Sequence, residues 1–471
     1  MSNPVTLQLN TLTTVPRSMG IKLLVVCGLA LVMTVPSFFV EGLLVDRTRR
    51  EADVVRDISS HVGGQQAILG PVLAVPYTIA ARTAQEAEQH GTYFVFPARA
   101  DATVKTTTEE RHRSLFKVPV FQADIKLDAW FDLTGVPAAA PAGATLNWSH
   151  AEIVVGVSDA RGALADGELV IGGKSAILAP AQIAPSLTLG ENQGQQTRLT
   201  LFGSNAATTA KPDAQFSTTA NLRFSGAQRI AVLAYGKTTH LAMQGDWPSP
   251  SFDGGFLPIA RSVTQHGFSA EWSVPYIARG VRAEGQADAI IGLDTTALGV
   301  SFVEMADPYQ SVSRSLKYVP LFLGLVFLSY FIFEVTAGKR VHPAQYVLVG
   351  VAQIIFYLLL LSLAERIGFD YGFLAAGAAT VILLAVNAGW IFASRLQLVR
   401  ALGVFSLLYA LIYLLLRLED DALLVGAIAS FAAIAAAMYF TRRIDWYSSA
   451  PLNSGDAPAS PVPLKHESIW R

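Results

Sequence analysis

The chain has 471 residues, of which 52% are hydrophobic and 15% are charged, and its formal net charge at pH 7 is -1. The charged fraction lies below the roughly 25% that is typical of soluble domains, and the near-zero net charge gives no indication of nucleic-acid binding. The single cysteine, Cys27, excludes an intramolecular disulfide and a zinc site made of cysteines.

Six apolar segments are each long enough to cross a lipid bilayer as a helix. Each has about 18–22 residues, which covers roughly 30 Å at 1.5 Å per residue. Backbone groups in hydrocarbon must bond within their own segment, which favours helices. The segments are 20–40, 319–338, 344–364, 372–393, 399–416 and 422–440. The sequence therefore predicts an integral membrane protein with six transmembrane α-helices, one N-terminal and five C-terminal.

The first apolar segment has the basic flank of a secretory signal peptide, with Arg17 and Lys22. It exceeds the 7–15 apolar residues of a signal peptide, and no small-residue cleavage motif follows it. We therefore interpret 20–40 as a retained anchor that follows a short N-terminus, 1–19.

Residues 47–62 favour a helix that continues the anchor beyond the membrane. Val54, Val55 and Ile58 form one apolar stripe among charged residues. The pair Gly63-Gly64 is expected to end this helix.

From about residue 68 the hydrophobic pattern changes to a period of two residues, which is typical of strands with one buried face. Three segments show it most clearly: 123–132, 216–224 and 268–274. Residue pairs typical of turns occur at Gly203-Ser204, Trp247-Pro248 and Gly254-Gly255. The pattern predicts a large, mostly antiparallel, sandwich-like β domain within 41–318. Whether this domain is one unit or two stays open, and the Ala- and Pro-rich segment 134–146 is the candidate boundary.

The distribution of lysine and arginine predicts the orientation of the six helices. With the N-terminus in the cytoplasm, the inner flanks carry Arg17, Lys22, Lys339, Arg340, Arg395, Arg400, Arg442 and Arg443. The short outer loops carry only Arg366 and Arg417, although Arg47, Arg49 and Arg50 follow the first helix on the outer side. This asymmetry predicts that both termini are cytoplasmic and that 41–318 is periplasmic. Residues 441–471 are expected to form a disordered cytoplasmic tail.

No catalytic, cofactor-binding or metal-binding motif emerges from the sequence. Residues 167–175 (GELVIGGKS) resemble a phosphate loop but have the wrong glycine spacing, so we expect no nucleotide. The histidines show no metal-protease spacing, and no nucleophile elbow is present.

Polar side chains within the apolar segments are more informative because they are costly in lipid. Glu334, Gln353 and Asn387 are the candidates. They could line a path for an ion or a small solute, or they could form hydrogen bonds between helices. We favour hydrogen bonding, because neither a second buried charge nor two matching half-bundles is evident.

Seven short motifs stand out along the chain: 70–77 (GPVLAVPY), 267–272 (GFSAEW), 302–310 (FVEMADPYQ), 314–318 (RSLKY), 331–334 (FIFE), 342–346 (HPAQY) and 361–369 (LSLAERIGF). Together they resemble the CreD family of bacterial inner-membrane proteins. The resemblance implies a protein of the cell envelope, linked to stress response, envelope integrity and tolerance of β-lactams. It implies no reaction and no catalytic residue.

Three functions follow as hypotheses. The first is a non-enzymatic envelope protein whose periplasmic domain binds an envelope component or an unknown partner protein, with the lipid bilayer as its other contact. The second is a small-solute or ion transporter that uses the polar residues of the C-terminal helices. The third is a membrane enzyme acting on lipid or cell wall, which would need a cleft with paired carboxylates.

Overall fold

The computed structural model describes residues 19–81, 87–113, 116–190, 196–302, 308–418 and 422–442. Their contacts divide the chain into two compact units, a membrane unit (Met1–Val45 with Pro308–Arg471) and a β domain (Asp46–Asp307). Of the predicted N-terminus 1–19 and the predicted tail 441–471, residues 1–18 and 443–471 lie outside the described residues.

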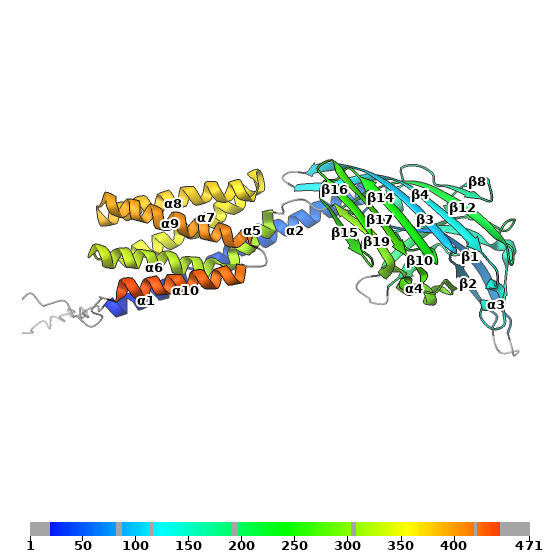
Figure 1. Ribbon diagram of the computed structural model, residues 1–471, viewed down its shortest axis with the longest axis horizontal. Coiled ribbons are helices and arrows are strands. Elements are labelled where there is room, and N and C mark those ends of the chain that lie inside the picture. Colours follow the sequence, from blue (N-terminus) through cyan, green and yellow to red (C-terminus); the bar gives the residue numbers. More distant parts are fainter. Residues whose placement is uncertain are drawn as a thin grey trace, which may run out of the picture. The chain divides into compact units, whose positions relative to one another are not determined.

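The membrane unit consists of helices (Figure 1), most of them apolar. Five helical stretches are long and apolar enough to cross a membrane, the first of them being Gly20–Val62 with 43 residues. A sixth, shorter apolar stretch is Leu424–Tyr439. The helices are α1 (Met19–Val32), α2 (Ser37–Val62), α5 (Pro308–Lys317), α6 (Val319–Ala337), α7 (Pro343–Ile367), α8 (Phe369–Phe392), α9 (Arg395–Arg417) and α10 (Ala422–Thr441). The predicted arrangement of one N-terminal and a group of C-terminal membrane helices is confirmed.

The N-terminal anchor is not one regular helix, because a tight turn at 33–36 separates α1 from α2. Pro36 has no backbone N–H to donate to Val32. The carbonyl oxygen of Val32 instead accepts from the Val35 nitrogen at 3.1 Å. The sequence analysis missed this irregularity, but it correctly placed the end of the helix at Val62, where Gly63 takes a φ of 81°.

The β domain is built from two sheets (Figure 1). The first has 11 strands along the order β10-β11-β6-β1-β13-β19-β15, with β2, β5, β9 and β18 attached at the side. Its strands are β1 (Gln66–Ile79), β2 (Gln89–Val95), β5 (Ala144–Leu146), β6 (Glu152–Val157), β9 (Ala179–Pro180), β10 (Ser186–Leu189), β11 (Thr197–Asn205), β13 (Arg229–Leu233), β15 (Pro250–Gly254), β18 (Glu284–Gly285) and β19 (Ala297–Phe302).

The second sheet has eight strands in the order β16-β17-β14-β3-β4-β12-β7-β8. They are β3 (Arg99–Arg113), β4 (Phe116–Asp132), β7 (Glu168–Ile171), β8 (Lys174–Ile177), β12 (Gln215–Ala227), β14 (Thr238–Gly245), β16 (Ala260–Thr264) and β17 (Gly267–Val274). Most pairs are antiparallel, whereas β1 with β13 and β14 with β3 are parallel. The short helices of the domain are α3 (Val136–Ala139), α4 (Tyr276–Arg279), η1 (Trp148–His150), η2 (Ala160–Gly162) and η3 (Ala287–Thr296).

One hydrophobic core receives side chains from both sheets, which confirms the predicted sandwich-like β domain. Strand β4 illustrates it, because the alternate residues Ile125, Leu127, Ala129 and Phe131 are all buried, as the period of two predicts. Tyr235 joins the sheets by donating to a carbonyl oxygen in β3 and to another in β4, each at 3.0 Å.

The structure shows what three segments singled out in the sequence form. Gly203-Ser204 is not a turn but lies inside β11, where a Cβ on Gly203 would come within 3.0 Å of the Ile153 carbonyl oxygen. Segment 134–146 is no boundary, because Ala144–Leu146 pairs with β1 within the same unit. Segment 167–175, which resembles a phosphate loop in sequence, forms the hairpin of β7 and β8, with positive φ at Gly172 and Gly173.

Candidate functional site

Glu334, the first polar candidate of the membrane unit, is 1% exposed, and both of its carboxylate oxygens have partners. One carboxylate oxygen is ion-paired with Lys22 of α1 and accepts from the Val341 nitrogen at 2.9 Å, and the other accepts from the Tyr346 hydroxyl at 2.9 Å. Lys22 also donates to the Val341 carbonyl oxygen at 2.9 Å. The carboxylate therefore ties α1, α6 and α7 together. The basic residues nearest to Glu334 in the sequence, Lys339, Arg340 and His342, gave no indication of this distant partner.

Gln353 and Asn387 also form bonds between helices. Gln353 of α7 is completely buried and accepts from the Tyr409 hydroxyl of α9 at 3.1 Å. Asn387 of α8 donates to the Tyr330 hydroxyl of α6 at 3.4 Å. Tyr330 in turn donates to the Leu384 carbonyl oxygen at 2.8 Å. Each of the three candidates thus has a partner on another helix, which is the hydrogen-bonding geometry expected of a packed bundle.

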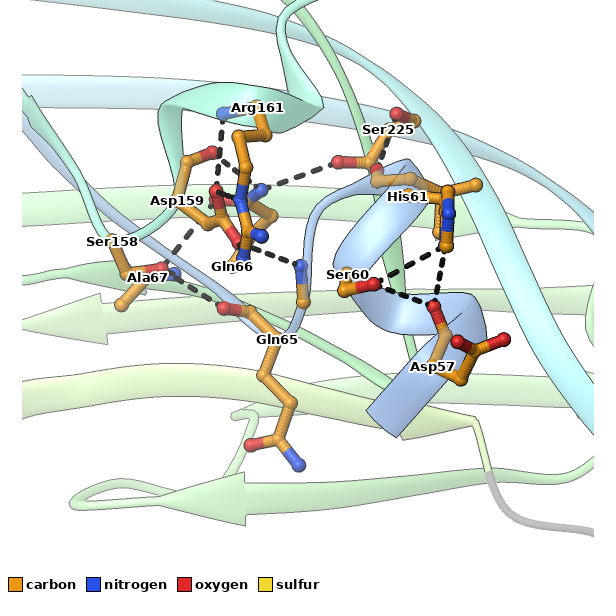
Figure 2. A network of polar contacts seen from close by, with 12 residues as sticks. Asp57, Ser60, His61, Gln65, Gln66, Ala67, Ser158, Asp159, Arg161 and Ser225 are labelled. Atoms are coloured by element: carbon orange, nitrogen blue, oxygen red, sulfur yellow. Dashed lines mark hydrogen bonds and ion pairs between the residues drawn. The ribbon is translucent and has the colours of Figure 1, made fainter. Parts of the chain in front are cut away.

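A polar junction fixes the end of α2 to the β domain (Figure 2). The Gln66 side chain donates to the carbonyl oxygens of Asp159 and Ser225, at 3.0 and 3.2 Å. The Ser225 hydroxyl donates to the carbonyl oxygen of Val62, the last residue of α2, at 2.6 Å. The bond from Ser225 satisfies a carbonyl group that the end of helix α2 leaves open.

Asp159 is the charged centre of this junction (Figure 2). Its carboxylate accepts from the Gly64 nitrogen at 3.2 Å and forms an ion pair with Arg161 at 2.6 Å. The hydrogen bonds from Arg161 are the main reason that the pKa of Asp159 lies below its ordinary value. The carboxylate is therefore ionised at neutral pH, where it can accept the bond from Gly64 at the end of α2.

The junction also has an apolar side. The predicted stripe of α2 packs against a small cluster of buried residues on the β domain, Val118, Val120 and Ala227. The residues of α2 in this contact are Val54, Val55, Ile58 and Val62. The outer half of α2 is thus part of the β domain's own packing, which gives the predicted stripe its physical role.

The β domain carries an open polar cleft of about 500 Å³. Two tyrosines and four other polar side chains contribute to its lining: Tyr93, Tyr276, Arg282, Glu284, Gln286 and Asp288. Its volume falls within the roughly 300–1,000 Å³ of small-ligand sites. Burial raises the pKa of Tyr93 to about 12, with nearby Glu284 adding to the effect. Burial also raises the pKa of Glu284.

Arg279 supports the wall of this cleft from within the protein. It is 2% exposed, and its guanidinium donates to the Ala234 carbonyl oxygen at 2.9 Å and to the Arg282 carbonyl oxygen at 3.4 Å. The guanidinium also lies 4.1 Å from the ring centroid of Phe96, a cation–π contact. Burial lowers the pKa of Arg279 to about 10. The segment that follows α4 is therefore held at a fixed place.

Sequence reasoning missed this cleft, since its residues come from positions as distant as Tyr93 and Asp288 and match no motif. Two carboxylates, Glu284 and Asp288, do lie in its lining. Among the residues that the structure describes, no group of three or more histidine, cysteine or acidic side chains could hold a metal ion. The lining provides hydrogen-bond donors and acceptors together with aromatic rings, and such groups can hold a polar ligand.

Comparison with known proteins identifies the family. The family model described as "Inner membrane protein CreD" matches residues 18–447. The curated protein "Inner membrane protein CreD" of Escherichia coli (strain K12) is 30% identical over 437 residues, which cover 89% of this chain and 92% of the relative. With its apolar helices and its large β domain, this chain belongs to the CreD family of inner membrane proteins, as its motifs had indicated.

Proposed function

We propose that this protein is a non-enzymatic, multi-pass inner membrane protein of the envelope stress response and of envelope integrity. In this proposal both termini are cytoplasmic, residues 41–318 are periplasmic, and the β domain binds an envelope component or a partner protein. The helices hold this domain at the membrane.

The single observation that carries the proposal is the open cleft of the β domain. Its lining offers Tyr276, which is 48% exposed, and the partly buried carboxyl group of Glu284. The polar candidates of the membrane unit, in contrast, are engaged with neighbouring helices, as at Glu334 and Gln353. A binding role therefore fits the β domain better than the bundle.

A pull-down with the full-length protein tests this role. The purified protein is immobilised in lipid nanodiscs and exposed to a solubilised bacterial envelope extract. We expect a component that the wild type retains and that the double variant Tyr276→Ala, Glu284→Gln releases. Ile277→Ala is the matched control, because Ile277 is 94% exposed in the same helix and does not line the cleft. Equal retention by the double variant, or no retention by the wild type, would contradict the role.

A transporter is the second candidate, and the buried ion pair of Glu334 with Lys22 is the observation in its favour. Charge inside a membrane often marks an ion path. Flux of labelled ions or small solutes into proteoliposomes, abolished by Glu334→Gln, would support this candidate. We expect no such flux, because both carboxylate oxygens of Glu334 already have partners that join the helices.

A further inference from the structure

We propose that the cleft of the β domain is an oligosaccharide-binding site. This inference rests on the proposed binding role and gives it a ligand class. The ligand would be a short stretch of glycan, from the cell wall or from an outer-membrane polysaccharide.

The aromatic residues of the cleft are the first reason. Tyr93 is 3% exposed and forms part of the wall, whereas Tyr276 is 48% exposed and available to a ligand. A sugar ring has one face of C–H groups, which packs well on an aromatic ring, and tyrosine adds a hydroxyl for hydrogen bonding. Tyr276 lies in α4, which Arg279 anchors to the interior. The exposed ring therefore sits on a fixed support and loses little freedom when a ligand binds.

The polar residues of the cleft are the second reason. Arg282 supplies donors and Glu284 and Asp288 supply carboxylate acceptors. Sugar hydroxyls both donate and accept, so a lining that mixes donors with acceptors suits them. The side chain of Gln286 is already oriented, because its nitrogen donates to the Tyr77 hydroxyl at 2.6 Å. This bond leaves the amide carbonyl oxygen as an acceptor toward a ligand.

The same lining argues against two other ligand classes. One arginine and two acids give these charged groups a formal charge of about -1, which disfavours a polyanion such as a nucleic acid. A lipid acyl chain needs an apolar wall, and polar side chains form most of this lining. An uncharged or weakly charged sugar chain is not repelled by this charge and does not need an apolar wall.

The test measures binding of the full-length protein in nanodiscs to two soluble glycans. One is a cell-wall glycan strand freed of its peptides, and the other is a neutral repeat oligosaccharide of an outer-membrane polysaccharide, freed of its lipid. Dextran serves as the comparison for non-specific binding. We expect saturable binding of one of the two glycans, with dextran at least tenfold weaker, and the tighter one identifies the source.

Variants connect that binding to the cleft. Tyr276→Ala and Glu284→Gln should each weaken the glycan about tenfold, whereas Ile277→Ala should stay within twofold of the wild type. Circular dichroism of each variant checks that the β domain remains folded. If Tyr276→Ala unfolds, Tyr276→Leu replaces it, because leucine keeps an apolar side chain without the aromatic ring and should also weaken the glycan about tenfold.

The outcomes separate this inference from the proposed function. Binding of neither glycan, or equal binding by the wild type and Tyr276→Ala, overturns the oligosaccharide site. If the pull-down then still retains an envelope protein, the binding role stands and only the ligand class is wrong. If neither experiment finds a ligand, both proposals fail.

Discussion

The membrane unit and the β domain use buried polar side chains in opposite ways. In the membrane unit, Glu334, Gln353 and Asn387 each bond to a side chain of another helix. In the β domain, Arg279 and Gln286 bond inward and thereby shape a cleft that opens to solvent. A polar group inside a membrane is thus not by itself a functional site. Its partners decide whether it holds the structure together or remains available to a ligand.

The orientation of the two units gives an all-or-none prediction. Alkaline phosphatase is active only outside the cytoplasm, so we expect an active fusion after residue 150 and inactive fusions after residues 341 and 445. The physical reason is the excess of lysine and arginine on the proposed inner flanks. Activity at 341 or 445 would contradict six spans with both termini cytoplasmic.

Lys22→Leu should produce the largest loss of stability in the membrane unit. It leaves the carboxylate of Glu334, which is 1% exposed, without its counter-charge. Removing one partner of a buried pair typically costs about 3–5 kcal/mol. We expect a lower thermal stability in detergent and a lower abundance in the membrane.

Glu334→Gln is the matched control for that variant. It retains hydrogen bonding to Tyr346 and leaves Lys22, which is 18% exposed, nearer to water. We expect abundance close to the wild type, and we expect Glu334→Gln to restore part of the stability lost in Lys22→Leu. No rescue in the double variant would show that the two residues are not energetically coupled.

The stability of the isolated β domain should depend on the outer half of α2. A fragment 46–307 keeps the contact of Val54, Val55, Ile58 and Val62 with the β domain, whereas a fragment 66–307 loses it. At about 25 cal/mol per Å² of apolar surface, four partly buried aliphatic side chains correspond to about 2–4 kcal/mol. Urea unfolding of both fragments measures the difference. Both should be mostly β by circular dichroism, and equal midpoints would contradict the packing role of α2.

Substitution of Asp159 should give the smallest loss of folding stability, and that loss depends on pH. Its pKa in the folded protein is below the ordinary value, so its contribution to stability is present above about pH 4. The contribution is lost as the pH falls through the lowered pKa. We expect Asp159→Asn to cost about 1–2 kcal/mol at pH 7 and progressively less toward pH 3.

Urea unfolding of the fragment 46–307 at several pH values checks this prediction. Glu271→Gln, on the exposed face of β17, is the control and should change little. A constant difference between the wild type and Asp159→Asn at every pH would show that the carboxylate charge is not what holds the junction.

Much of the fold could be predicted because it is encoded in local patterns. Continuous apolar segments predicted the membrane helices, and alternation predicted strands such as β4 and β12. Glycine was a weaker guide, because it serves both turns and close contacts. Gly254 ends β15, but Gly203 lies inside β11 where Ile153 approaches closely. The parallel pairing of β1 with β13 joins residues more than a hundred positions apart, and no local pattern encodes it.

A candidate site could be predicted only where the type of residue is unusual for its surroundings, such as a carboxylate within an apolar segment. Glu334 stood out because a carboxylate is costly in lipid, yet its partner Lys22 is separated from it by 312 positions. The cleft had no such signal. Tyr93 and Glu284 are ordinary residues of a β domain until the pairing of β2 with β18 brings their strands together. The sequence therefore indicated the residues that are costly in lipid but not the cleft of the β domain.

The most direct test of the account compares variants of the two units in cells that lack the protein. Each variant is expressed at matched membrane abundance, and survival in a β-lactam and in detergent is measured. We predict that Glu334→Gln and Gln353→Leu restore survival as the wild type does, and that the double variant Tyr276→Ala, Glu284→Gln does not. Full function of the cleft variant, with loss of function in Glu334→Gln, would contradict the account and place the activity in the membrane unit.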